Sequence, residues 1–153
     1  MKYIIQYIVA SLLLMFSTLV AWFEGSAIRQ DPWEWKYTAF FSEKLNGEVT
    51  NATDLSQLDH FIYAAKFTPV YPILMIVSLA YIITLSGFVL LNKQKKIMIY
   101  FHLALGLLFI LLALVVADSP TTGGKYLMST FLFMGVILVF LAVFFFVKKS
   151  AVE

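Results

Sequence analysis

Side chains that could carry chemistry are few in this chain and lie far apart in its sequence. There are two histidines, His60 and His102, and no cysteine among the 153 residues. The lack of cysteine excludes a disulfide framework, a thiol nucleophile and thiolate metal ligands. A metal site needs several ligands at one point, and the two histidines are expected on opposite sides of a membrane. We therefore predict no metal site and no cofactor.

His102 is the one histidine or charged residue within the long apolar runs of the sequence. An ionisable residue inside a membrane span is a candidate for proton movement or ligand binding. His102 is expected near the end of its span, where a neutral imidazole can hydrogen-bond a neighbouring helix or reach the headgroups. No Asp or Glu accompanies it inside a span, so a structural role is favoured. It remains the candidate intramembrane polar site.

Three acidic residues, Glu24, Asp31 and Glu34, could gather near the outer surface of the membrane. Together with His60 in one cleft they would indicate a membrane-embedded enzyme. Acids in a polar loop are usually only solvated, however. The chain also has no glycine-rich phosphate loop and no dinucleotide fingerprint. We predict that it is not an enzyme.

The sharpest polar feature is the segment 31–37, with the sequence Asp-Pro-Trp-Glu-Trp-Lys-Tyr. Aromatic rings beside a carboxylate and an amine suit the docking of a partner protein, a lipid headgroup or a wall component. Because Trp and Tyr also favour the membrane interface, an interfacial anchor is the simpler interpretation. The candidate interaction surface consists of Trp33, Glu34, Trp35, Lys36 and Tyr37.

Four apolar runs must position these residues. Hydrophobic residues make up 61% of the chain, and each run has the length of about 20 residues that a helix needs to cross a bilayer. Barrel strands would alternate in polarity, and these runs do not. We predict an all-α integral membrane protein, a four-transmembrane-helix bundle forming a single membrane domain over residues 1–153. The predicted spans are residues 3–23, 71–91, 97–117 and 126–147.

The placement of lysines predicts the orientation. The basic turn 92–96 and the chain ends place six lysines on one side, whereas five basic residues and eight of the nine acids fall on the other. Both termini are therefore expected in the cytoplasm. The first span also resembles a signal peptide that is cleaved after Ala27. Its apolar run exceeds the usual signal-peptide core, so we expect an uncleaved anchor.

Residues 24–70 are the expected external segment, and its first part predicts one helix. Asp31 is placed to cap it, and Asn46-Gly47 to end it. Aromatic residues recur on one face, so we expect an amphipathic helix lying on the membrane. A small sheet, as in claudin-like proteins, is the alternative. The cysteine pair of those proteins is missing, which argues against the sheet.

A second helix is predicted in the later part of the external segment. It begins at Thr53 or Asp54, with Gln57 at the capping-box position after Asp54. Apolar residues then recur at helical spacing, and Thr68-Pro69 interrupts the chain before the second span.

Small residues recur seven positions apart in every predicted span. This spacing places them on one stripe and allows close helix contact, although such pairs also arise by chance. We keep both readings open. The pairs are Ala10 and Ser17, Ala80 and Gly87, Gly106 and Ala113, and Gly135 and Ala142.

Two stretches carry a family resemblance: Phe-Ser-Thr-Leu-Val-Ala-Trp-Phe-Glu-Gly-Ser at 16–26 and Pro-Trp-Glu-Trp-Lys-Tyr at 32–37. With them the chain resembles the YjdJ-like small membrane proteins of unknown function from spore-forming Gram-positive bacteria. The resemblance covers roughly the N-terminal half. The part from Lys93 onward has no counterpart that we recognise. The resemblance implies a location in a bacterial plasma membrane and implies no activity.

The function favoured by the sequence is contact with other molecules. We expect a non-enzymatic interaction or regulatory subunit of a cell-envelope complex, with the lipid bilayer and another membrane or envelope protein as partners. The lysines near the span ends are explained by orientation and anionic lipid, so no nucleic acid is expected. The alternative is a small transport or lipid-binding membrane protein with the external segment as a lid.

Overall fold

The computed structural model describes residues 2–150, and describes side chains for residues 3–147. Helices account for most of this range, and no strand occurs within it, so the sheet alternative for the external segment does not apply. The elements in chain order are α1 (Lys2–Gly25), η1 (Ser26–Gln30), α2 (Pro32–Thr38), α3 (Phe40–Asn46), η2 (Ala52–Asp54), α4 (Gln57–Phe67), α5 (Val70–Leu91), α6 (Lys95–Val116) and α7 (Thr122–Ser150).

Four of these helices, α1, α5, α6 and α7, are long and apolar enough to cross a membrane. Each occupies one of the four predicted runs, which confirms the helical part of the fold prediction. The 22 residues of α5 rise about 33 Å, close to the ~30 Å hydrocarbon thickness of a bilayer. The remaining helices lie together at one end of the four.

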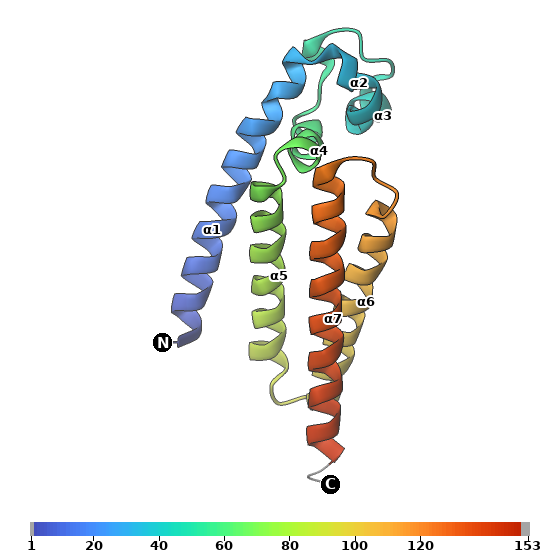
Figure 1. Cartoon of the computed structure of the whole chain (residues 1–153). Coiled ribbons are helices and arrows are strands. Elements are labelled where there is room, and N and C mark those ends of the chain that lie inside the picture. Colours follow the sequence, from blue (N-terminus) through green and yellow to red (C-terminus); the bar gives the residue numbers. More distant parts are fainter. Residues whose placement is uncertain (1, 151–153) are drawn as a thin grey trace.

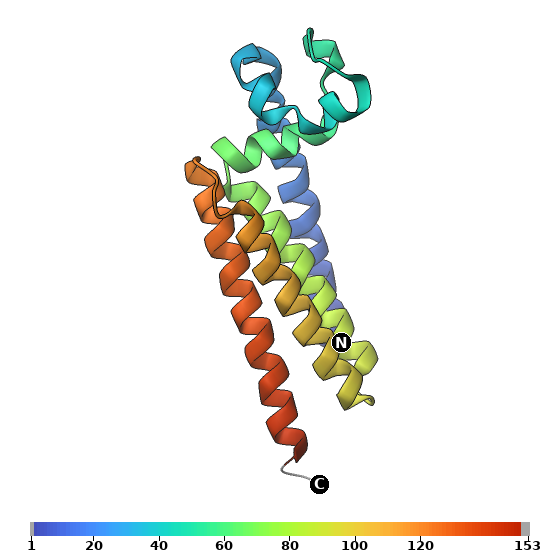
Figure 2. The same ribbon diagram turned by 90° about the vertical axis from the view of Figure 1, so that its right-hand side faces the viewer.

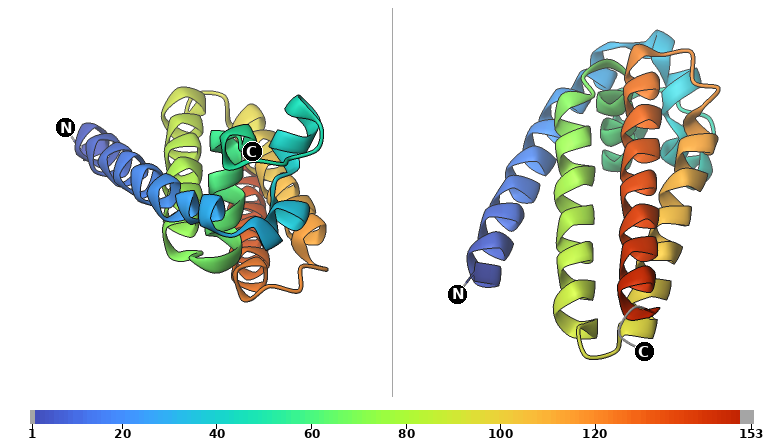
Figure 3. Two further views of the ribbon diagram at one scale, coloured as in Figure 1. Left: turned by 90° about the horizontal axis from the view of Figure 1, so that it is seen from above. Right: turned by 60° about the horizontal axis from the view of Figure 1, so that its bottom comes forward.

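The long helices form a three-helix group with the fourth helix on its flank (Figure 1). α6 packs mainly on α7, and α1 packs mainly on α5. Seen from above, α1 runs outward from the other three toward its N-terminal end (Figure 3). Both chain ends and the turn between α5 and α6 lie at one end of the bundle, which we call the terminal side. The short elements lie at the other end, the cap side.

The small residues predicted to form packing stripes are all buried. Gly106 of α6 and Gly135 of α7 face each other, because a Cβ at either position would meet the carbonyl oxygen of the other. Such contacts let two helix backbones approach closely. The small residues are thus buried in all four helices, and close contact of two backbones is shown for Gly106 and Gly135.

Within residues 3–147, two separate clusters of buried apolar side chains form cores. The larger one joins α5, α6 and α7 through Ala80, Phe109, Ala113, Leu127, Phe131 and Leu138. The smaller one, built from Ile28, Ala39 and Leu55, lies inside the segment that follows α1. That segment therefore has a core of its own.

The prediction of a single helix from Asp31 to Asn46 is wrong. The backbone leaves helical geometry at the buried Ala39, with φ −80° and ψ 44°, and α2 ends there. A new helix, α3, then begins at Phe40 and ends at Asn46, where Gly47 takes φ 82°. The predicted stop at Asn46-Gly47 is confirmed.

The predicted start of the second helix is also wrong. Asp54 closes the short 3-10 turn η2, in which it forms a capping box with Asn51. The helix proper, α4, starts at Gln57, with the Ser56 side chain accepting a hydrogen bond from the Leu58 backbone. The predicted interruption at Thr68-Pro69 does separate α4 from α5.

Candidate interaction site in the cap

Residues 26–67, from η1 to α4, form a folded unit that we call the cap. Its α4 lies across the ends of the long helices rather than parallel to them (Figure 2). α2 lies farther from the terminal side than α4 does (Figures 1 and 2). α4 therefore lies between α2 and the ends of α5 and α7.

Two glycines bring α4 against the long helices. A Cβ on Gly25 of α1 would overlap the backbone carbonyl of His60, and a Cβ on Gly123 of α7 would overlap the carbonyls of Ala65 and Lys66. Only a residue without a side chain allows this approach of backbone to backbone. α4 thus contacts both the first and the last of the long helices.

Asp59 of α4 holds the first turn of α3. Its buried carboxylate accepts hydrogen bonds from the backbone N–H groups of Phe41 and Ser42, at 2.9 Å each, and from the Ser42 hydroxyl. The Ser42 hydroxyl in turn accepts a hydrogen bond of 2.7 Å from the Ser56 backbone. A carboxylate at a helix N-terminus satisfies otherwise unpaired N–H groups. This contact explains why a new helix begins just after Ala39.

Glu34 of α2 is paired with Lys66 of α4. The Lys66 ammonium donates to Glu34 Oε2 at 2.8 Å and to Thr38 Oγ1 at 2.6 Å, and the Thr38 hydroxyl donates to Glu34 at 2.9 Å. The hydrogen bond from Lys66 is the main reason why the pKa of Glu34 is lowered, and burial opposes it. Each of the two charged side chains is 20% exposed. Glu34 therefore fastens α2 to α4.

Trp35 also faces inward. Its indole N–H donates a 2.8 Å hydrogen bond to the carbonyl of Ile28, and its ring packs against the small core of the cap. The candidate surface predicted from segment 31–37 is therefore divided: Glu34 and Trp35 hold the cap together, while Trp33, Lys36 and Tyr37 are exposed.

The exposed part of the cap is rich in large apolar side chains. Trp33 is 81% exposed and Tyr37 61%, and they lie one helical turn apart on α2. The Lys36 ammonium lies 5.6 Å from the centre of the Tyr37 ring. Phe40 at 60% and Leu45 at 69% add to this exposure on α3.

His60 lies in the contact between α4 and α1. Its ring is buried, lies 5.9 Å from the Trp22 ring between centroids, and has no hydrogen-bond partner for either nitrogen among the described residues. Burial lowers the pKa of His60, and the charge of Arg29 lowers it further, whereas the Trp22 backbone and Asp59 act in the opposite direction. Because the pKa of His60 is lowered, its neutral imidazole is favoured. Trp22 also donates a 2.7 Å hydrogen bond to Gln57 of α4.

Two of the four residues that would have indicated an enzyme lie in different contacts. Glu34 lies between α2 and α4, and His60 lies between α1 and α4. Asp31, another of the four, acts together with Glu34 on Tyr63 of α4. Burial raises the pKa of the Tyr63 hydroxyl, and the charges of Asp31 and Glu34 raise it further. Over the described residues no group of three His, Asp or Glu could hold a metal ion.

His102 lies inside the bundle on α6. Its Nδ1 is hydrogen-bonded to the Met98 carbonyl of the same helix at 2.7 Å, and its buried ring meets the rings of Phe101 and Phe145 edge-on. These contacts involve no second ionisable side chain.

Comparison with known proteins reaches the part of the chain that contains α1, the cap and α5. The sequence profile of a domain of unknown function, DUF4306, matches residues 4–91. An uncharacterized protein of Bacillus subtilis (strain 168), YjdJ, is 39% identical over 94 residues, which are 60% of this chain and 85% of the relative. No solved structure matches. The resemblance noted in the sequence is confirmed, and α6 and α7 lie beyond the matched region.

Proposed function

Since the chain belongs to the DUF4306 family, a domain of unknown function, we propose that it is a multi-pass protein of the bacterial plasma membrane whose cap binds another membrane or envelope protein. In this proposal it acts by contact and is not an enzyme. The single observation that carries the proposal is the division of the cap into two parts. In the inner part, hydrogen bonds and an ion pair hold the helices together, and in the outer part aromatic side chains are exposed.

Membrane insertion and orientation are part of the proposal. Four apolar helices with many large apolar side chains exposed, such as Leu90 at 78% and Val115 at 80%, suit a surface that faces lipid. The six lysines of the terminal side favour the cytoplasm for both chain ends. The cap then faces the outside of the cell. A tag at the C-terminus that is reached from outside intact cells contradicts this orientation.

The inner half of the cap is fixed by bonds between its elements. Asp59 joins α4 to α3, and the Glu34 to Lys66 pair joins α4 to α2. Residues on such a scaffold need little further ordering when a partner binds, which keeps the entropic cost of binding low. A rigid scaffold that leaves a Trp and a Tyr exposed is typical of a docking surface, because these residues dominate binding energy at interfaces.

The position of α2 favours docking over a membrane anchor. α4 lies between α2 and the long helices (Figure 2). With the spans in the bilayer, Trp33 and Tyr37 then lie beyond the layer that contacts the headgroups. The exposed rings and Lys36 suit a partner protein that has an apolar or anionic patch.

Photo-crosslinking in living cells tests this proposal. A photoreactive phenylalanine derivative at Tyr37 is expected to capture one defined protein, and Trp33→Ala is expected to reduce the capture several-fold. The same derivative at Val115, an exposed position on α6, serves as the control and is expected to capture lipid. If position 37 yields only lipid adducts, the surface is an anchor and the docking proposal fails.

A lipid-binding or transport protein with the cap as a lid is the second candidate. It is favoured by an apolar groove of about 390 Å³ where α4 meets the ends of α5, α6 and α7. Ile62, Met75 and Leu127 are among its lining residues. A bulky Ile62→Trp substitution that displaces a co-purified lipid, as seen by native mass spectrometry, would support this candidate.

A further inference from the structure

The family match and the fold divide the chain at the same point. The matched residues 4–91 end at Leu91, which is the last residue of α5. The Bacillus subtilis relative has about 17 residues outside its matched part, because 94 residues are 85% of it. One span alone needs about 20 residues. The relative is therefore too short for counterparts of both α6 and α7. We call α1, the cap and α5 the family unit, to which this chain adds the hairpin α6–α7.

The hairpin packs mainly on itself. α6 makes most of its contacts with α7, where Gly106 and Gly135 let the two backbones approach closely. Five of the six residues of the larger core belong to these two helices, and only Ala80 comes from α5. An antiparallel pair of helices with a short turn is a common supersecondary unit. The two helices therefore form one unit where they meet α5.

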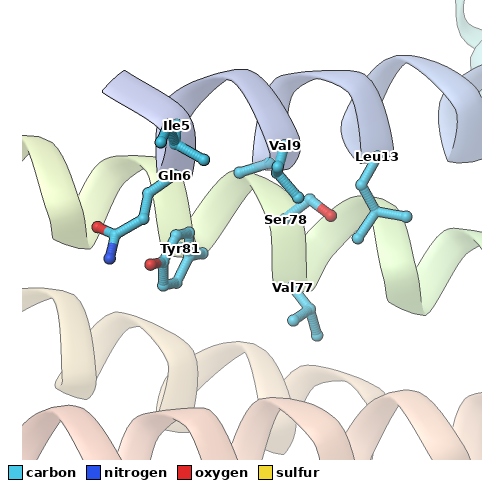
Figure 4. Close-up of a pocket in the computed structure, with 8 residues that line it drawn as sticks. Ile5, Gln6, Val9, Leu13, Val77, Ser78 and Tyr81 are labelled. Carbon is cyan, nitrogen blue, oxygen red and sulfur yellow. The ribbon is translucent and has the colours of Figure 1, made fainter. Parts of the chain in front are cut away.

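α5 lies between the hairpin and α1 (Figure 3). Ser78 and Tyr81 of α5 line a groove of about 350 Å³ together with Val9 and Leu13 of α1 (Figure 4). Ala80 is two positions from Ser78 and therefore points about 200° away around the helix. It packs against the core of the hairpin. α1 and the hairpin thus occupy different faces of α5.

The face covered by the hairpin receives it closely at both ends. On the terminal side, a Cβ on Gly87 of α5 would overlap the Phe101 ring of α6. On the cap side, a Cβ on Gly123 of α7 would overlap the carbonyls of Ala65 and Lys66 in α4. Small residues at such points let one helix approach another closely. The contact therefore runs along α5 and continues onto α4.

The covalent link between the two units is short. It consists of residues 92–94, which are all exposed. A short tether holds a bound module at a millimolar effective concentration. The two surfaces therefore need only moderate affinity to stay together in the intact chain.

We propose that α5 and α4 form a docking surface for an apolar two-helix hairpin, and that α6–α7 is its built-in occupant, bound as one unit. The partner of this surface is thus part of the same chain. Gly123 meets the α4 backbone at Lys66, whose side chain bonds Glu34 of α2, so the bound hairpin also supports the cap. Docking of another protein at the outer part of the cap is a separate proposal, and neither depends on the other.

Cutting the folded, full-length protein between the two units tests this proposal. A protease site is inserted in the turn 92–94, and the protein is purified in mild detergent and cut. An unlabelled batch is then mixed with an isotope-labelled batch and followed by native mass spectrometry. The hairpin is expected to stay bound after the cut and to exchange as a whole between the batches within hours. A protease site in the turn 117–121 between α6 and α7 is the matched control, and α7 is expected not to exchange.

Two variants of the cut protein test the contact with α4. Gly123→Leu places a side chain against the α4 backbone, so the fraction of cut protein that keeps its hairpin is expected to fall several-fold. Thr122→Leu, at the exposed neighbouring position, should leave this fraction unchanged. Equal fractions in the two variants would overturn the part of α4 in the docking surface.

Three results of the cutting experiment overturn the proposal. If the hairpin is lost on cutting and does not rebind, the surface has no affinity of its own. If the hairpin stays bound but never exchanges, or if α7 exchanges as fast after the control cut, the hairpin is not a separate unit. Capture of no partner at Tyr37 would contradict docking at the cap and leave the exchange of the hairpin unaffected.

Discussion

Lys66 Nζ lies 2.8 Å from Glu34 Oε2, and this pair is the charged link between α4 and α2. Through its backbone the same residue also contacts the last long helix, because the Lys66 carbonyl lies against Gly123 of α7. Lys66 thus links α2, which carries the exposed aromatic rings, to α7, a helix outside the residues 4–91 that match the family.

Lys66→Met is expected to loosen α2 from α4. It removes the ammonium and leaves Glu34 with Thr38 as its remaining partner. The pair is partly exposed, so we expect a loss of about 1 kcal/mol or less in unfolding free energy. Hydrogen exchange in α2 should speed up while exchange in α6 stays constant. Lys36→Met is the matched control, since Lys36 is exposed on α2 and forms no ion pair within residues 3–147. Equal effects of the two substitutions would contradict the role of the pair.

The cap is expected to loosen in acid. The pKa of Glu34 is lowered from its ordinary value of 4.5, so its contribution to stability is fully present above pH 4.5 and is lost as the pH falls through the lower folded value. Hydrogen exchange of α2, followed from pH 6 downward and corrected for intrinsic rates, should increase below pH 4.5. Glu34→Gln should remove this part of the pH dependence. An unchanged acid response in that variant would exclude Glu34 as its source.

Asp59→Ala is expected to be among the most damaging substitutions in the cap. It leaves the partly buried N–H of Phe41 and the buried N–H of Ser42 unpaired, at a cost of about 2 to 4 kcal/mol. The measurement is thermal unfolding in detergent, together with hydrogen exchange of α3. Asp54→Ala removes a more exposed capping carboxylate of the same cap and should cost about 1 kcal/mol. An Asp59 variant as stable as the Asp54 variant would argue against the buried contact.

Gly25→Ala is expected to destabilise the junction between α1 and α4. Within an ordinary helix, Gly to Ala stabilises by up to about 1 kcal/mol, but here the added Cβ overlaps the His60 carbonyl. Because both partners are backbone, we expect the sign to reverse, with a loss of about 1 to 3 kcal/mol. Ala27→Ser, at an exposed position two residues later, should be neutral. Thermal unfolding distinguishes the two, and a stabilised Gly25→Ala protein would show that the contact is loose.

His102→Leu tests the role of the intramembrane histidine. Since the ring bonds its own helix and packs against Phe101 and Phe145, an apolar side chain is expected to preserve folding within about 1.5 kcal/mol. Any transport or docking activity found later should be retained. Loss of activity at unchanged thermal stability would instead assign His102 a functional role.

Much of the architecture follows from local sequence alone. The four apolar runs become the four long helices, because a run of that length has its backbone satisfied only within a helix when lipid surrounds it. The spacing of Gly106 and Gly135 left a packing stripe and chance both open, and the structure shows that these two glycines do meet. Asn46-Gly47 ends a helix because glycine readily takes the positive φ that follows a helix C-terminus. Thr68-Pro69 ends one because the residue before a proline is disfavoured in helical geometry.

The cap could not be predicted in this way, because distant residues decide it. Asp59 is 17 residues from Ser42, and Lys66 is 32 residues from Glu34. Periodicity places Glu34, Trp35 and Tyr37 in one exposed segment, and only the folded chain shows that the first two turn inward and the third outward. The sequence by itself determined which segments are apolar helices. The tertiary structure decided where the helices of the cap break and which aromatic rings stay exposed, because those outcomes depend on hydrogen bonds between elements that no local pattern records.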